Sequence, residues 1–280
     1  MNRSDLTPEQ ALRWWAEAGV DFVIDEEPHD RFAEASPVAQ ARAPAAPVVA
    51  AIQAAASKPL AARVAPRIEQ ATIASPDEAV RSARELAARA DSLESLRETF
   101  DKFDGCGLKA TATQLVFSDG AADAPVMLVG EAPGGDEDRI GRPFVGRAGQ
   151  LLDRMLAAIG LDRSKVYIAN VVAWRPPGNR TPTLQETAIC LPFIQRQIEL
   201  VDPDLLVCLG ASSAQTLLGV KEGITRVRGK WFDYQVGEKT IKALAMLHPA
   251  YLLRQPAQKR AAWRDLRALS AALAEISKAE

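Results

Sequence analysis

Short apolar runs and longer segments with apolar residues at helical spacing alternate from residue 75 onward. The short runs predict buried strands, each followed by Gly, Asn or His, at 126–129, 166–169, 205–209 and 241–247. The longer segments predict helices, at 79–99, 148–159, 183–200, 211–218 and 257–276. Strands separated by helices are typical of an α/β fold, so we predict three α/β/α layers around a mostly parallel central sheet.

The first 74 residues show a different pattern. The dipeptide Thr7-Pro8 gives a helix-start signal for an N-terminal helical segment at 1–32, whose apolar face suits a protein partner. Residues 33–66 contain 15 Ala and 5 Pro, so we interpret 33–74 as an Ala/Pro-rich, disordered linker. The folded domain is then expected at 75–280.

The composition is that of an ordinary soluble protein, with 48% hydrophobic and 25% charged residues. Every apolar run is shorter than the ~18 residues that span a membrane. The acidic N-terminus does not resemble a secretory signal, which predicts a cytoplasmic protein. Cys106, Cys190 and Cys208 are an odd number at long spacings, which indicates no disulfide framework and fits a reducing compartment.

The charge is unevenly distributed along the chain. The net charge is −2, but residues 1–100 hold 11 Lys and Arg against 16 Asp and Glu, whereas 101–280 hold 23 against 20. The positive excess therefore belongs to the predicted folded domain. It permits a local basic surface, although charge alone does not indicate a nucleic-acid ligand.

Polar residues follow three of the predicted strands. Glu131, Asn170 and His248 each come at or just after the carboxyl end of an apolar run. In an open α/β sheet these ends line the ligand crevice, so the three side chains are predicted to meet in one site.

Three motifs accompany these polar residues. Glu131 lies in Gly-Glu-Ala-Pro-Gly at 130–134, which is followed by Gly-Arg-Pro-Phe-Val-Gly at 141–146. The first loop lacks the Gly-Lys-Ser/Thr ending of a phosphate-binding P-loop. Asn170 precedes Arg-Pro-Pro-Gly-Asn-Arg at 175–180, and His248 begins His-Pro-Ala.

In order and spacing, these motifs resemble the signatures of the family-4, thermostable-type uracil-DNA glycosylases over roughly 103–266. The resemblance implies a base-excision repair enzyme that flips uracil out of DNA and hydrolyses its N-glycosidic bond, leaving an abasic site. Residues 75–280 would be the catalytic domain, uracil-containing DNA the partner, and a monomer the expected form.

The resemblance assigns the chemistry to two side chains. Glu131 would position water and stabilise the cationic sugar, and His248 would donate to uracil O2 as negative charge develops there. The alternatives are a capping carboxylate and a structural histidine. The neighbouring acids at 136–138 are interpreted as a solvated acidic face.

The resemblance also implies residues that bind the base and the DNA. Ala132 would line the uracil pocket, Phe144 would stack on the base, and Asn170 would read its N3/O4 edge. A core aromatic and a turn-forming Asn are the alternatives for the last two. The DNA-binding candidates flank the second and third motifs; they are Arg175, Asn179, Arg180, Tyr251, Leu252, Leu253 and Arg254. For Tyr251–Arg254, helix packing competes with an apolar wedge that fills the space left by the base.

The chain departs from the family at its iron–sulfur ligands. Family-4 enzymes hold a [4Fe–4S] cluster with four cysteines, and the matching positions here are Phe103, Cys106, Trp174 and Cys190. Two thiolates cannot hold a cubane cluster, so no cofactor and no metal are expected. The remaining cysteine, Cys208, lies in an apolar strand, where it cannot easily replace a missing ligand, and is expected to be a small buried hydrophobe.

Two other functions remain open from sequence. One is a superfamily member with broader specificity for deaminated bases or with covalent trapping of uracil, although the loop at 174–180 lacks the extra His of the trapping branch. The other is a non-catalytic DNA-binding or scaffold protein that uses the N-terminal helix to dock a partner.

Overall fold

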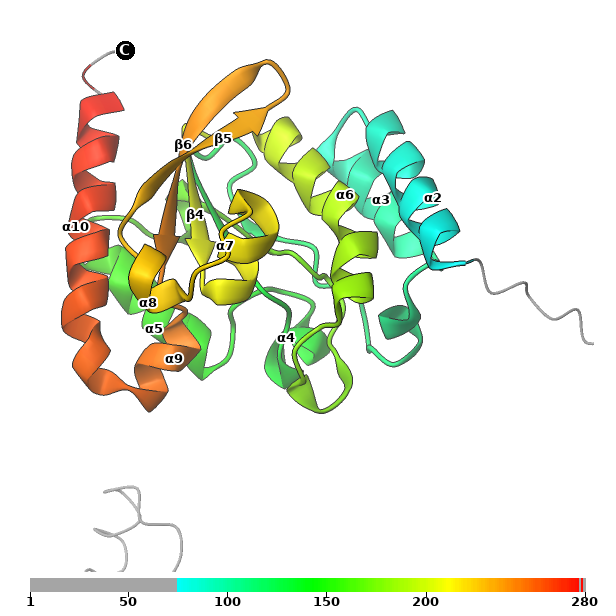
Figure 1. The fold of residues 1–280 in the computed structure, drawn as a ribbon, viewed down its shortest axis with the longest axis horizontal. Helices are drawn as coiled ribbons and strands as arrows, with labels where there is room; N and C mark the ends of the chain where they lie inside the picture. Colours follow the sequence, from blue (N-terminus) through cyan, green and yellow to red (C-terminus); the bar gives the residue numbers. More distant parts are fainter. Residues whose placement is uncertain (1–74, 277, 279–280) are drawn as a thin grey trace, which may run out of the picture. The chain divides into compact units, whose positions relative to one another are not determined.

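The computed structural model describes residues 75–276 and 278, so the predicted N-terminal helical segment and linker at 1–74 lie outside the described residues. A six-stranded sheet has the order β1-β3-β2-β4-β6-β5 (Figure 1). Its strands are β1 (Asp119–Gly120), β2 (Val126–Gly130), β3 (Tyr167–Asn170), β4 (Leu205–Leu209), β5 (Trp231–Val236) and β6 (Lys239–Met246). The four inner strands are parallel and both edge strands are antiparallel, which confirms the mostly parallel sheet.

Helices cover both faces of the sheet and give the predicted three layers (Figure 1). One face packs against α2 (Pro76–Arg89), α3 (Leu93–Lys102), α6 (Leu184–Val201) and α7 (Ala211–Leu218). The other packs against α5 (Arg147–Ala157), α9 (Pro249–Arg254) and α10 (Lys259–Ile276). The short helical elements are α4 (Gly135–Ile140), α8 (Ile224–Val227), η1 (Gly107–Ala110), η2 (Arg163–Lys165), η3 (Pro177–Asn179) and η4 (Pro256–Gln258).

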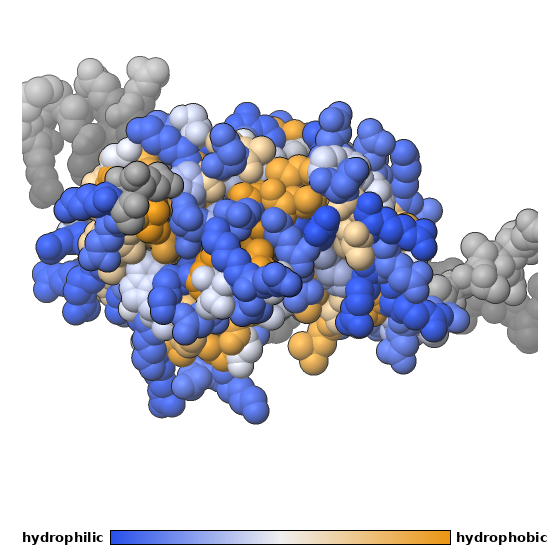
Figure 2. All heavy atoms as spheres, turned by 90° about the horizontal axis from the view of Figure 1, so that it is seen from above, coloured by the Kyte–Doolittle hydropathy of each residue, from blue (hydrophilic) through white to orange (hydrophobic). Residues whose placement is uncertain are grey.

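The sheet divides the interior into two hydrophobic cores. Successive side chains of a strand point to opposite faces, so Met127 and Val129 of β2 enter the core under α6, whereas Val126 and Leu128 enter the core under α10. Both faces of β2 and β4 are fully buried, which explains why these strands are continuous apolar runs. Polar residues cover most of the face drawn in Figure 2, and apolar side chains reach the surface in small groups between them.

The structure corrects two sequence predictions about elements. The helix predicted at 79–99 is two helices, because the chain is extended at Ala90 and Ser92 and the Ser92 side chain caps α3 by accepting from Ser95 N. The edge strand β5 was missed, since most of its residues are only half-buried or exposed. The reciprocal Thr183/Glu186 capping box at the start of α6 is confirmed.

The parallel strands bring their carboxyl ends to one edge of the sheet. β2 leads into Glu131, β3 ends at Asn170, and β6 leads through Leu247 to His248, which is the N-cap of α9. These ends lie on the side of the sheet with α4, α8 and α9, opposite the β5–β6 hairpin (Figure 1). None of the helices in the described ranges is long and apolar enough to cross a membrane.

Candidate active site

A cavity of about 1050 Å³ opens at this carboxyl edge. The prediction that Glu131, Asn170 and His248 meet in one site is confirmed, because all three line the cavity. Nine side chains named from sequence line it in all: Glu131, Ala132, Phe144, Asn170, Asn179, Arg180, His248, Tyr251 and Arg254. Arg175, Leu252 and Leu253 are not among the lining residues.

Glu131 is partly buried in the cavity wall directly after β2. Burial raises the pKa of its carboxyl group, and a hydrogen bond from the Thr181 side chain opposes this only in part. Its Oε1 atom is buried and accepts no hydrogen bond from the protein. A carboxylate in this state retains an acceptor for a ligand and a charge that is poorly compensated by its surroundings.

Asn170, the last residue of β3, is buried and its Oδ1 atom also lacks a hydrogen-bond donor. It faces Gly130 on the neighbouring strand, and a Cβ atom at Gly130 would lie 2.4 Å from Asn170 Oδ1 and 2.6 Å from Phe144 Cζ. Gly130 therefore makes room for the amide and the aromatic ring together. An amide offers a donor and an acceptor side by side, which suits a planar ligand edge with the complementary pair.

Phe144 lies in the loop between α4 and α5, with its ring in the cavity wall. Its ring centroid is 5.5 Å from that of His248, with an angle of 31° between the ring planes. The backbone of Phe144 has φ +55°, in the left-handed region that residues with a side chain seldom adopt. The aromatic face is thus held beside the amide and the imidazole by an unusual loop conformation.

The protonation state of His248 follows from its surroundings. Burial lowers its pKa to about 4, and Arg254 acts in the same direction, so the imidazole is neutral at pH 7. The backbone N–H of Ala250 donates to Nδ1 at 3.1 Å, which places the remaining proton on Nε2. His248 is therefore a neutral hydrogen-bond donor at the cavity.

The acids at 136–138 are not the solvated face predicted from sequence. Glu137 accepts from the backbone N–H groups of Gly134, Val145 and Gly146 at 3.1, 2.9 and 2.9 Å. Asp138 is 4% exposed and accepts from the backbone and hydroxyl of Thr113, both at 2.8 Å. Only Asp136 is exposed; Glu137 organises the loop that carries Phe144, and Asp138 ties α4 to Thr113.

Two of the arginines predicted to bind DNA, Arg175 and Arg180, have protein partners. Arg175 donates to Asn179 Oδ1 at 2.7 Å and packs over Gly135. Arg180 forms a two-pronged pair with Glu186, at 2.8 and 2.6 Å, and this bond is the main reason that the pKa of Glu186 falls to about 2. Both arginines thus fix the loop that precedes α6.

The structure corrects the prediction that Leu252 contacts DNA as part of an apolar wedge. It is 1% exposed and packs in the core under α10, so helix packing is its role in this structure. Leu253 is 37% exposed. Sequence analysis missed Leu184, which is 92% exposed at the first turn of α6 and lines the cavity. A single exposed Leu after Pro182 gives no periodic signal, and only the structure places it at this rim.

The four positions that the resemblance assigns to cluster ligands lie in the core that contains α6. Trp174 is 1% exposed and Phe103 is 5% exposed. Two further rings connect them: Phe100 meets Trp174 edge-on at 4.6 Å and stacks on Phe193 at 3.8 Å, and Phe193 lies 5.3 Å from Phe103. The Sγ atoms of Cys106 and Cys190 are 4.0 Å apart, and both residues are buried.

This set of side chains does not fit a cubane cluster. Such a cluster takes four thiolate ligands, and the whole chain has three cysteines. Cys208 is buried in β4, where burial raises the pKa of its thiol to about 12. Within the residues that the structure describes, no three His, Cys, Asp or Glu side chains are grouped to hold a metal ion.

Comparison with known sequences shows which family the chain belongs to. Residues 117–267 match the Uracil DNA glycosylase superfamily, which defines the class of protein. The type-4 uracil-DNA glycosylase of Thermotoga maritima is 45% identical over 170 residues, covering 60% of this chain and 87% of the relative. Those of Archaeoglobus fulgidus and Pyrobaculum aerophilum are 44% and 39% identical over 155 and 178 residues, covering 54% and 62% of this chain and 78% and 91% of the relatives. The chain belongs to the type-4 uracil-DNA glycosylase family.

Proposed function

We propose that this protein is a uracil-DNA glycosylase that hydrolyses the N-glycosidic bond of uracil in DNA and so begins base excision repair. One observation carries the proposal beyond family membership. Glu131 Oε1 and Asn170 Oδ1 are the buried side-chain atoms without a hydrogen-bond partner in the described part of the chain, and both residues line the same cavity. Unpartnered buried acceptors are costly, and a bound substrate that donates to them removes that cost.

The base is read by two side chains, Phe144 and Asn170. A flipped uracil stacked on Phe144 would place its Watson–Crick edge at Asn170. Asn170 Oδ1 then accepts from uracil N3–H, and its Nδ2 donates to O4. Cytosine has an acceptor at N3 and a donor at N4, so the same amide orientation would leave both of its groups opposed to groups of the same kind.

The bond is broken with charge separated across the cavity. As the C1′–N1 bond lengthens, positive charge grows on the sugar and negative charge grows on uracil O2. Neutral His248 donates from Nε2 to that oxygen, while ionised Glu131 stabilises the sugar and orients a water toward C1′. The water adds its hydroxyl to C1′, and the proton it loses passes through solvent to the uracil anion, which leaves an abasic site and free uracil.

The rim of the cavity would carry the DNA. Tyr251 and Arg254 line one side, next to the exposed Leu253, and Asn179, Arg180 and Leu184 line the other. We assign Leu253 and Leu184 as apolar contacts to the bases beside the flipped nucleotide. The three buried free cysteines suit a reducing compartment, and we place the enzyme in the cytoplasm as a monomer.

Uracil release is the direct test of this function. Purified protein is expected to excise uracil from a labelled oligonucleotide in the presence of a chelator, because no step above uses a free metal ion. The abasic product is detected by alkaline cleavage and gel electrophoresis. An oligonucleotide with cytosine at the same position is the control. Tight binding to the uracil oligonucleotide without cleavage would favour a non-catalytic scaffold instead.

The proposal includes the absence of an iron–sulfur cluster. It is supported by the buried aromatic side chains at two of the four ligand positions, Phe103 and Trp174, and by the rings of Phe100 and Phe193 that connect them. We call these four side chains the aromatic plug. Their apolar surface takes over the tethering that thiolate–iron bonds provide elsewhere in the family.

Purified protein is therefore expected to be colourless. Anaerobic preparation should give no absorption near ~400 nm, where thiolate-bound iron absorbs, and no stoichiometric iron. The double variant Phe103→Cys/Trp174→Cys, prepared with iron and sulfide, shows whether the assay detects a cluster at this place. A brown wild-type preparation with about four irons per chain would contradict the proposal.

A further inference from the structure

The conformation of Phe144 needs an external support. Its φ of +55° lies in the left-handed region, where a residue with a Cβ atom is disfavoured. Its carbonyl group packs against the start of α5, where a Cβ atom at Gly149 would lie 1.6 Å from Phe144 O. Gly149 leaves room for this carbonyl but offers no side chain to hold it. Another group must fix the carbonyl, and through it the ring.

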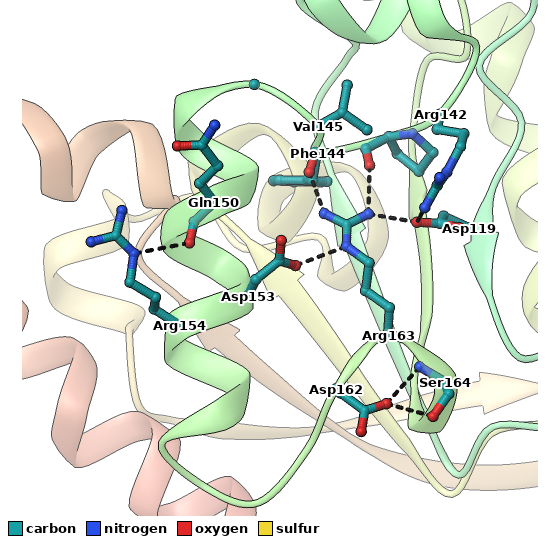
Figure 3. A network of polar contacts seen from close by, with 12 residues as sticks. Asp119, Arg142, Phe144, Val145, Gln150, Asp153, Arg154, Asp162, Arg163 and Ser164 are labelled. Atoms are coloured by element: carbon teal, nitrogen blue, oxygen red, sulfur yellow. Dashed lines mark hydrogen bonds and ion pairs between the residues drawn. The ribbon is translucent and has the colours of Figure 1, made fainter.

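Arg163 supplies that support (Figure 3). This residue lies in η2, between α5 and β3, and its Nη2 group donates to the carbonyl of Phe144. Its Nη1 group donates to the carbonyl of Pro143 at 3.1 Å. One planar guanidinium therefore binds two successive carbonyl oxygens of the loop. This fixes the direction of the two peptide groups that flank the Cα atom of Phe144.

The guanidinium is itself held in place by two carboxylates. Arg163 Nη1 donates to Asp119 at 2.5 Å, and Nε donates to Asp153 at 2.8 Å. Burial alone would raise the pKa of Asp119, but hydrogen bonds from Arg142 and Arg163 more than offset it and keep the carboxyl ionised. The side chain of Arg163 is 21% exposed, so these bonds are only partly screened by solvent. Strand β1, helix α5 and the Phe144 loop are thereby joined at one side chain.

We infer that Arg163 is a positioning residue for base recognition, acting through the backbone of Phe144. Neither Arg163 nor its carboxylate partners line the cavity, so the residue does not touch the substrate. The inference rests on the proposed function, in which the Phe144 ring stacks on uracil. It adds that the angle of this ring is set from outside the site.

Lysine at position 163 is the informative substitution. It keeps the positive charge between Asp119 and Asp153, but its single ammonium cannot bind two carboxylates and two carbonyls in one plane. The Arg163→Lys protein should therefore fold while Phe144 loses its fixed conformation. Arg228→Lys is a matched control, because Arg228 also binds a buried carboxylate, Asp265, and a carbonyl, that of Ala261, and none of the three lines the cavity.

The experiment compares uracil excision under single-turnover conditions with inhibition by free uracil. Arg163→Lys is expected to slow excision about tenfold and to raise the inhibitory uracil concentration about tenfold, the range for a weakened base–aromatic stack. Arg228→Lys should leave both unchanged. Thermal melting of both variants shows how much of each effect comes from lost stability. Both variants are expected to melt close to the wild-type temperature and to be folded at the assay temperature.

A double-substitution cycle tests the route of the effect. In a Phe144→Leu protein, whose leucine fills much of the same space without an aromatic face, Arg163→Lys should cause little further loss. An equal tenfold loss in both backgrounds, or wild-type uracil inhibition in Arg163→Lys, would overturn the inference. If Arg163→Lys does not fold, Asp153→Asn loosens the guanidinium more gently, and an unchanged uracil inhibition there would overturn it as well. Failure of the wild-type protein to release uracil would instead overturn the proposed function.

Discussion

Replacing Glu131 or His248 with Ala is expected to lower the single-turnover rate of uracil excision by about 10²-fold or more, because each removes a transition-state contact. Glu131 supplies the charge opposite the sugar, and His248 supplies the proton donor opposite uracil O2. Substrate binding should change much less than the rate, since the stacking ring and the reading amide remain. Rates and binding are measured on the same uracil oligonucleotide, by quenched-flow and by fluorescence anisotropy.

The pH dependence separates the two residues. Burial raises the pKa of Glu131, and the pKa of His248 is lowered to about 4. As the pH falls from 7, Glu131 gains a proton first and the rate should fall, whereas His248 stays neutral until about pH 4. Glu131→Gln should flatten this acid limb of the profile, and His248→Ala should retain it.

Two results would contradict these roles. A near wild-type single-turnover rate in either alanine variant would remove that residue from the chemistry. An acid limb that persists unchanged in Glu131→Gln would assign the titration to a different group. The Asp136→Ala variant is the matched control for Glu131, because its carboxylate is exposed beside the same loop and should be dispensable for the rate.

The second large effect concerns stability. Trp174→Ala is expected to lower the free energy of unfolding by about 3–5 kcal/mol, and Phe103→Ala by a similar amount, because each empties an aromatic site in a closely packed core. Trp174 is 1% exposed, and the Phe100 ring contacts it edge-on. Denaturant titration followed by circular dichroism gives the difference in unfolding free energy.

Trp263 on α10 provides the control for this measurement. It is 43% exposed, so Trp263→Ala should cost about 1 kcal/mol or less. Equal losses at Trp174 and Trp263 would mean that the aromatic plug contributes no special stability. The Trp174 variant should also weaken uracil binding, because Trp174 leads into the loop of Arg175, Asn179 and Arg180 beside the cavity.

The parts of the fold that depend on burial were predictable from sequence. Strand β4 is a run of five residues buried on both faces, and its predicted bounds match the structure. In short helices the spacing of apolar residues did not show which side is buried. Helix α9 has six residues, and only the structure shows that Leu252 is buried while Leu253 reaches the surface. At 90–92 the helical period of the apolar residues continues through the break, so the cap at Ser92 was hidden.

The candidate site was predictable where it depends on strand order, and not where it depends on long-range polar contacts. Glu131, Asn170 and His248 follow apolar runs, and parallel pairing brings them together. Arg163 contacts groups 10 to 44 positions away, and such bonds leave no periodic trace in the sequence. The same holds for Glu137, whose three backbone donors lie on both sides of α4, at Gly134 before the helix and at Val145 and Gly146 after it.

The cavity lies where the two helical layers meet at the sheet edge. Helices α6 and α7 form one wall, and Phe144 with α9 forms the other. Each wall rests on its own core, because the sheet keeps the two sets of packed side chains apart. A change of side-chain volume deep in one core should therefore shift one wall, together with the groups it carries, relative to the other and alter the width of the cavity. Substitutions in either core, far from the site, can in this way change which bases fit into the cavity.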